Sequence, residues 1–135
     1  MTKRRKIVLD SWPVVAYLQG ETAAKPVIEI IADAHDNGDE ILMSVVNAGE
    51  VWYTVARRTD PSRADEAIDL LRSLGIKFID ADWPLTKLAA GYKVKGNISY
   101  ADCYAAALAK QQKAALITGD HDFKQLDDEI AITWL

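Results

Sequence analysis

Four acidic residues stand where the predicted elements would bring their carboxylates together. Asp10 ends the apolar run "KIVLD", and Asp120 follows the apolar run "ALITG". Glu50 lies in "SVVNAGEVWYTVARR" and Asp102 in "SYADCYAAALAKQ", and both stretches have helical periodicity. Clustered carboxylates repel one another, by roughly 4 kcal/mol for a pair about 4 Å apart, unless they bind protons or cations. Ligands that are all oxygen suit a hard cation such as Mg²⁺ or Mn²⁺.

The surrounding sequence alternates between short apolar runs and longer helical stretches. Strands are predicted at residues 6–10, 40–44, 76–79, 115–119 and 130–134, and helices at 11–19, 24–37, 44–58, 61–74, 83–94 and 99–113. This alternation predicts an α/β fold, a single three-layer α/β/α domain over residues 1–135 with a mostly parallel five-stranded sheet. Ligands of such sheets bind at the carboxyl ends of the strands, so we expect the four acids to meet there.

Each of these acids also has a purely structural interpretation. Ser99 and Asp102 have the spacing of a helix capping box. Asp10 could form a turn before a helix that Ser11 caps. Glu50 could be a solvated helix residue. At each position taken alone, the sequence leaves both interpretations open.

Two aspartates compete for the last acidic position. Asp120 could be an ordinary loop aspartate, and Asp122 follows it by two residues. We prefer Asp120 because it lies nearer to the end of the predicted strand. The predicted convergence of four acids at one sheet edge, rather than any single position, favours a functional site.

Composition limits the possible partners only in part. A net charge of −4 argues against a polyanionic ligand, but an acidic cleft that holds cations can still attract phosphate. Lys93 and Lys95 are candidates for substrate contacts because their stretch, "GYKVKGNISY", leads into the Asp102 helix. The single cysteine excludes an intramolecular disulfide, and no run approaches the roughly 18 apolar residues of a membrane span. We therefore expect a cytoplasmic protein without membrane association.

Four motifs, in order and in residue type, make the chain similar to the PIN-domain ribonucleases. They are "VLDSW", "NAGEVWYTVAR", "SYADCYAAALA" and "LITGDHDF". In size the chain resembles the VapC-type toxins of toxin–antitoxin pairs. The resemblance implies a catalytic site of Asp10, Glu50, Asp102 and Asp120, in which Asp10, Asp102 and Asp120 bind Mg²⁺ or Mn²⁺.

The resemblance also implies an activity and a set of partners. Ser11 and Thr118 would lie beside the site, where their hydroxyls support a ligand or touch phosphate. The chain would be a divalent-metal-dependent endoribonuclease with an RNA substrate, a small cognate antitoxin and a second copy of itself as partners. Trp12 and Pro13 stand where the family more often has small residues. The alternative is a non-catalytic RNA- or protein-binding module on a degenerate PIN fold.

Two other carboxylate-dependent classes fit the sequence less well. A receiver-like phosphoacceptor domain needs an acidic pair after its first strand and a lysine on its last. Here "LDSW" holds a single acid and "IAITW" holds no lysine. A haloacid-dehalogenase-type phosphatase needs a second aspartate at the position of Trp12.

Overall fold

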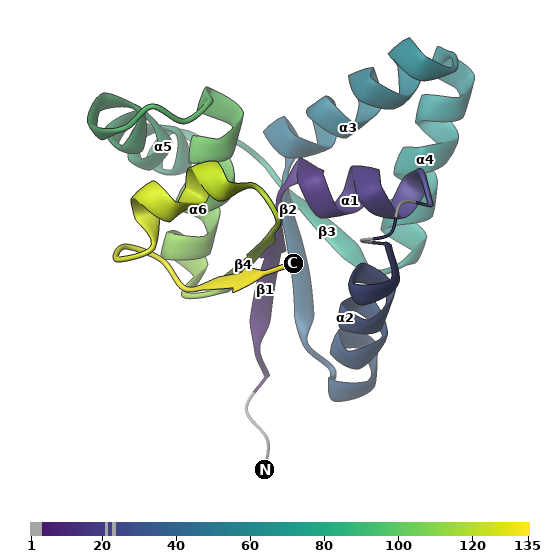
Figure 1. Cartoon of the computed structure of the whole chain (residues 1–135), viewed down its shortest axis with the longest axis horizontal. Helices are drawn as coiled ribbons and strands as arrows, with labels where there is room; N and C mark the ends of the chain where they lie inside the picture. Colours follow the sequence, from purple (N-terminus) through teal and green to yellow (C-terminus); the bar gives the residue numbers. More distant parts are fainter. Residues whose placement is uncertain (1–3, 21, 23) are drawn as a thin grey trace.

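The computed structural model describes residues 4–20, 22 and 24–135, which form an α/β structure around one sheet (Figure 1). The strands are β1 (Lys6–Leu9), β2 (Glu40–Ser44), β3 (Ile76–Ile79), β4 (Ala115–Thr118) and β5 (Ile132–Trp134). They lie in the order β3-β2-β1-β4-β5, and every neighbouring pair is parallel. The predicted five-stranded, mostly parallel sheet is confirmed.

Helices cover both faces of this sheet. They are α1 (Ser11–Leu18), α2 (Ala24–Asn37), α3 (Val45–Arg58), α4 (Pro61–Ser73), α5 (Trp83–Lys95), α6 (Tyr100–Gln112) and the short 3₁₀ helix η1 (His121–Leu126). Figure 1 shows α5 and α6 on one side of the sheet, and α1, α2 and α4 on the other. Across residues 4–20, 22 and 24–135, no helix is both long and apolar enough to cross a membrane.

The central strands alternate their side chains between two apolar cores, and their carboxyl ends are polar. Val8 packs into the core beneath α5 and α6, whereas Leu9 packs into the core beneath α1 to α4. Just beyond these apolar residues, the ends of β2, β1 and β4 carry the buried polar residues Ser44, Asp10 and Thr118. Polar groups are thus buried side by side at one edge of the sheet.

Serine caps begin the two helices that carry Glu50 and Asp102. The hydroxyl of Ser44 accepts a hydrogen bond from the Val46 N–H at 3.1 Å, at the start of α3. The hydroxyl of Ser99 accepts one from the Asp102 N–H at 3.1 Å, at the start of α6. Because each cap sets where its helix begins, it also sets which residues face the sheet edge.

Candidate active site

A cavity of about 440 Å³ lies where the carboxyl edge of the sheet meets α1, α3 and α6. It is lined by Asp10, Ser11, Trp12, Val15, Ala16, Glu50, Thr54, Ser99, Asp102, Asp120 and Asp122. Among the described residues that line it, five are acidic and none is a lysine or an arginine. The structure therefore brings the four predicted acids together and adds Asp122 to them.

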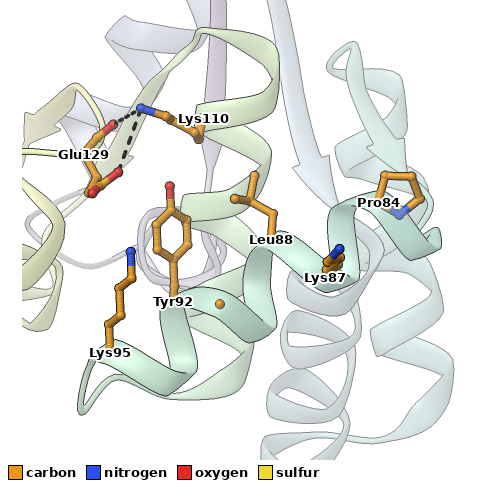
Figure 2. Close-up of a pocket in the computed structure, with 8 residues that line it drawn as sticks. Pro84, Lys87, Leu88, Tyr92, Lys95, Lys110 and Glu129 are labelled. Carbon is orange, nitrogen blue, oxygen red and sulfur yellow. Dashed lines mark hydrogen bonds and ion pairs between the residues drawn. The ribbon is translucent and has the colours of Figure 1, made fainter.

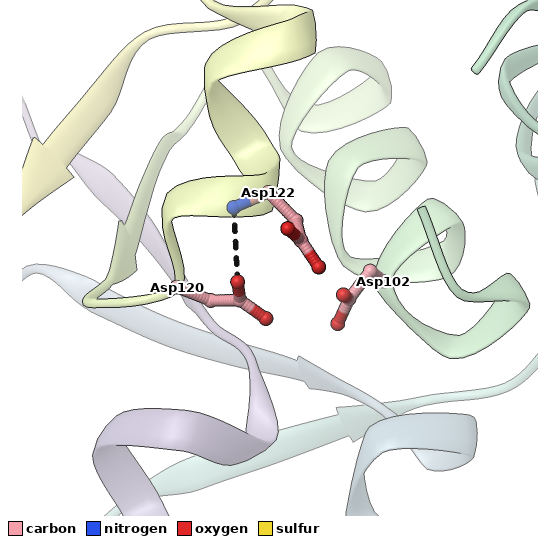
Figure 3. Close-up of side chains that lie close together, drawn as sticks. All are labelled: Asp102, Asp120 and Asp122. Carbon is pink, nitrogen blue, oxygen red and sulfur yellow. Dashed lines mark hydrogen bonds between the residues drawn. The ribbon is translucent and has the colours of Figure 1, made fainter. Parts of the chain in front are cut away.

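Three of the aspartates could bind one cation together. Asp102, Asp120 and Asp122 each offer a carboxylate oxygen, and these oxygens lie within 4.8 Å of one another. Figure 3 shows Asp102 on α6 facing Asp120 and Asp122 at the start of η1. The Asp122 N–H donates a hydrogen bond of 2.9 Å to Asp120 Oδ1, so the chain turns directly from one acid to the other. Both competing aspartates therefore contribute to the cluster.

Asp10 lies deeper, and its carboxylate serves neither a turn nor a helix cap. It occupies the N-cap position of α1, but its side chain makes no cap hydrogen bond. Only 1% of the residue is exposed. Asp10 Oδ2 accepts a hydrogen bond of 3.1 Å from the Thr118 hydroxyl, while Oδ1 is buried without a hydrogen-bond partner. A buried carboxylate oxygen in this state calls for a proton, a water molecule or a cation as its partner.

Burial and mutual repulsion raise the pKa values of the two most buried aspartates. The pKa of Asp10 is well above its usual range, mainly because of burial and then because of the charge on Asp102. Burial, followed by the charge on Asp120, raises the pKa of Asp102 to about 6. The hydrogen bond from Thr118 acts in the opposite direction on Asp10. Bound positive charge would relieve this repulsion, so the oxygen-only donor set fits Mg²⁺ or Mn²⁺.

Glu50 is held at the cavity wall by two side-chain donors. The Ser11 hydroxyl donates to Glu50 Oε1 at 3.1 Å, and Asn47 Nδ2 donates to the same oxygen at 3.2 Å. Asn47 Nδ2 also donates to the Ala101 carbonyl at 3.1 Å and thereby ties α3 to α6. The expectation that Ser11 caps α1 is wrong, because Ser11 is the first helical residue and its hydroxyl is directed to Glu50.

Asn47 was missed by the sequence reasoning, although its spacing carries a signal. It precedes Glu50 by three residues in "NAGE", which places both side chains on the same face of α3. Asn47 is fully buried. A buried amide one turn before a candidate acid indicates a residue that orients it.

Thr118 supports the cavity without lining it. Its hydroxyl donates to Asp10 and accepts a hydrogen bond of 3.0 Å from the Asp120 N–H. The residue is fully buried. Thr118 therefore orients two acids from beneath the cavity, whereas Ser11 lines it directly.

The structure places both predicted lysines away from the lining of this cavity. Lys93 Nζ donates a hydrogen bond of 2.7 Å to the Ile98 carbonyl. Lys95 lines a separate cavity of about 390 Å³ between α5 and α6, together with Tyr92 and Lys110 (Figure 2). Neither lysine therefore lines the acidic cavity, and their role in substrate binding stays a prediction.

Comparison with known proteins identifies the family. A family model described as the PIN domain matches residues 7–129, nearly the whole chain. The chain belongs to the PIN domain family. This match confirms the resemblance found in the four acidic motifs, all of which fall inside or at the edge of the matched range.

Several solved structures share the fold at low sequence identity. VapBC2 from Rickettsia felis, bound to a promoter DNA fragment, is 17% identical with a TM-score of 0.72, covering 96% of this chain and 98% of that chain. VapBC-1 from nontypeable Haemophilus influenzae is 18% identical with a TM-score of 0.73, covering 96% and 97%. VapC20 from Mycobacterium tuberculosis, a Sarcin-Ricin loop cleaving toxin, is 18% identical with a TM-score of 0.71, covering 88% and 93%. No curated protein sequence matches the chain significantly.

Proposed function

We propose that this PIN-domain protein is a divalent-metal-dependent endoribonuclease and the toxin of a toxin–antitoxin pair. The observation that carries the proposal is the acidic cavity, in which one oxygen of Asp10 is buried without a partner beside the clustered Asp102, Asp120 and Asp122. Such an arrangement is costly for a protein unless it binds a cation. Phosphodiester hydrolysis is a reaction that a cation held by carboxylates can catalyse, because the cation activates water and stabilises charge on the phosphate.

Each acidic residue has a role that follows from its position. Asp102, Asp120 and Asp122, together with Asp10, would hold Mg²⁺ or Mn²⁺. When bound, the cation offsets negative charge on the phosphate and lowers the pKa of the attacking water. Glu50 faces the cavity with its carboxylate fixed by Ser11 and Asn47, so it can accept a hydrogen bond from that water and orient it. Attack by water would leave a 5′-phosphate and a 3′-hydroxyl.

The proposed partners are a small cognate antitoxin and a second copy of this chain. Two observations support a toxin rather than another kind of nuclease. The chain spans nearly the full length of the similar VapBC and VapC chains. Two further similar structures are a toxin–antitoxin complex from Klebsiella pneumoniae and a member of the VapBC family of toxin–antitoxin systems from Mycobacterium tuberculosis. VapC20 is described as a Sarcin-Ricin loop cleaving toxin, which supports RNA as the substrate here.

The deciding experiment compares the wild type with Asp10→Asn and Asp102→Asn on structured RNA in Mg²⁺, Mn²⁺ or EDTA. The matched control is Asp69→Asn, which makes the same chemical change on the exposed face of α4. We expect cation-dependent cuts with 5′-phosphate ends, a loss of at least roughly 100-fold in both site variants, and an unchanged rate in the control. Cutting that survives EDTA, or equal cutting by all four proteins, would overturn the proposal.

A further inference from the structure

Trp12 forms a flat wall of the acidic cavity because residue 119 is a glycine. A Cβ atom on Gly119 would lie 2.5 Å from Trp12 Cη2 and 2.7 Å from both Cζ2 and Cζ3. No other residue type would leave the indole ring in this position. Trp12 lines the cavity and keeps 37% of its surface exposed. The ring is therefore supported by backbone on one side and open to a ligand elsewhere.

The cavity has two walls of different chemistry. The α1 wall is apolar and consists of Trp12, Val15 and Ala16. The acidic wall lies next to it and carries Asp102 on α6 and Asp120, which directly follows Gly119 in the β4–η1 connection. A nucleotide has the same division, with a flat aromatic base on one side and a charged phosphate on the other. A cation on the acidic wall would attract the phosphate, and the indole offers a stacking surface to the base.

We propose that Trp12 is a stacking platform for one unpaired nucleobase, which positions the nucleotide whose phosphate faces the acidic wall. The inference rests on the proposed function, which gives RNA as the bound polymer. It adds the requirement that the bound nucleotide is unpaired. Bases inside a duplex have both faces covered by their neighbours, so Trp12 selects nucleotides in loops, bulges or ends. Because every base has a π-face, stacking gives this selectivity without reading a sequence.

The test measures binding of two labelled probes by fluorescence anisotropy in Ca²⁺, with the full chain. One probe is an oligoadenylate of about 12 nucleotides, and the other is an abasic ribose-phosphate chain of equal length and charge. The variants are Trp12→Leu, Trp12→Phe and Gly119→Ala. The control is Trp83→Leu, since Trp83 begins α5, is 68% exposed and lies outside the cavity lining.

We expect the wild type and the control to prefer oligoadenylate over the abasic chain by roughly tenfold. Trp12→Leu should lose this preference, and Trp12→Phe should keep part of it. Gly119→Ala keeps the indole but displaces it, so its preference should also fall. Oligoadenylate should quench indole emission in the wild type more strongly than in Trp12→Phe. If Trp12→Leu fails to fold, the phenylalanine and alanine variants still decide the question.

Two results would overturn the inference, and both are distinct from failure of the proposed function. They are the absence of any preference in the wild type, and an equal preference in the wild type and the Trp12 variants. Because the assay does not require cleavage, a chain that shows the Trp12-dependent preference but never cuts RNA would overturn the nuclease proposal alone. A chain that cuts RNA without the preference would overturn the stacking inference alone.

Discussion

The hydroxyl of Thr118 donates a hydrogen bond to Asp10 Oδ2 across 3.1 Å and so joins the ends of the neighbouring strands β4 and β1. The same hydroxyl accepts the Asp120 N–H, so one buried oxygen fixes two of the site's acids. Asp10 Oδ1 receives no such bond. One oxygen of the most deeply buried carboxylate is thus hydrogen-bonded, and the other is left for a proton or a cation.

Thr118→Val should weaken binding of Mn²⁺ while leaving the fold intact. Valine has nearly the same shape but cannot donate to Asp10, and loss of that bond raises the pKa of Asp10 further. Removal of a group that orients a ligand typically weakens metal affinity by about 10- to 100-fold. Isothermal titration calorimetry at neutral pH measures this, with Thr118→Ser as the control that retains the hydroxyl. Equal affinities for the wild type and the valine variant would contradict the expectation.

Asp10→Asn should stabilise the protein in EDTA at about pH 8.5, where solvent favours the ionised carboxyl. At this pH the wild type either buries a charge beside Asp102 or holds a proton that the unfolded chain has released, and both lower its stability. Removing that charge should raise the free energy of unfolding by about 1–3 kcal/mol. Thermal melting without Mg²⁺ tests the gain in stability of the variant. Melting with Mg²⁺ tests whether the variant has lost its stabilisation by the cation. A lower melting temperature for Asp10→Asn in EDTA would show that the buried charge is already compensated.

The stability of the cation-free protein should fall as the pH rises from about 4 to 6. The pKa of Asp102 is about 6 in the folded protein and 3.8 for an unperturbed aspartate, so the folded state binds this proton more tightly than the unfolded chain does. The contribution of that proton is complete below pH 3.8 and is lost as the pH rises through 6. Because the pKa of Asp10 is also raised, the loss should continue to higher pH.

Melting curves across this pH range, in EDTA and in saturating Mn²⁺, test whether stability falls as the pH rises. Stabilisation by Mn²⁺ should grow with pH, since cations replace the departing protons. Asp102→Asn should flatten the fall between pH 4 and 6. A fall of the same steepness in the variant would assign the effect to other groups.

Most of the fold could be predicted because local signals agree with the tertiary structure. In α4, Asp60 caps the helix through the Arg63 N–H, Pro61 opens it, and Gly75 follows its end with a φ of +86°. The prediction extended β5 too far, since Ile130 is buried in the core without belonging to the strand. The six-residue η1 was not predicted, because a helix that short leaves little periodicity to detect.

Contacts that depend on loop geometry could not be predicted from sequence. The hydrogen bond from the Lys93 ammonium group to the Ile98 carbonyl is one example, because it depends on how the chain bends after α5. Trp12 looked like a departure from the family pattern. The structure shows that Gly119, distant in sequence, provides the space for its ring. Both relationships join residues on different elements, and neither leaves a pattern within one segment.

Asp120 and Asp122 should contribute comparably to cation binding, although only Asp120 was selected from the sequence. Both place an oxygen within 4.8 Å of Asp102, and the turn into η1 holds them together. We therefore expect Asp120→Asn and Asp122→Asn each to weaken Mn²⁺ binding by roughly tenfold or more. Asparagine also caps helices, so Asp120→Asn should preserve η1 and isolate the loss of charge.

The control for this comparison is Asp128→Asn, an exposed aspartate beyond η1 that does not line the acidic cavity. Its Mn²⁺ affinity should equal that of the wild type. If Asp122→Asn behaved like Asp128→Asn while Asp120→Asn lost affinity, Asp122 would be a surface residue whose proximity to the cluster follows only from the turn. Loss of affinity in both would instead mean that the short 3₁₀ helix, absent from the predicted elements, completes the cation site.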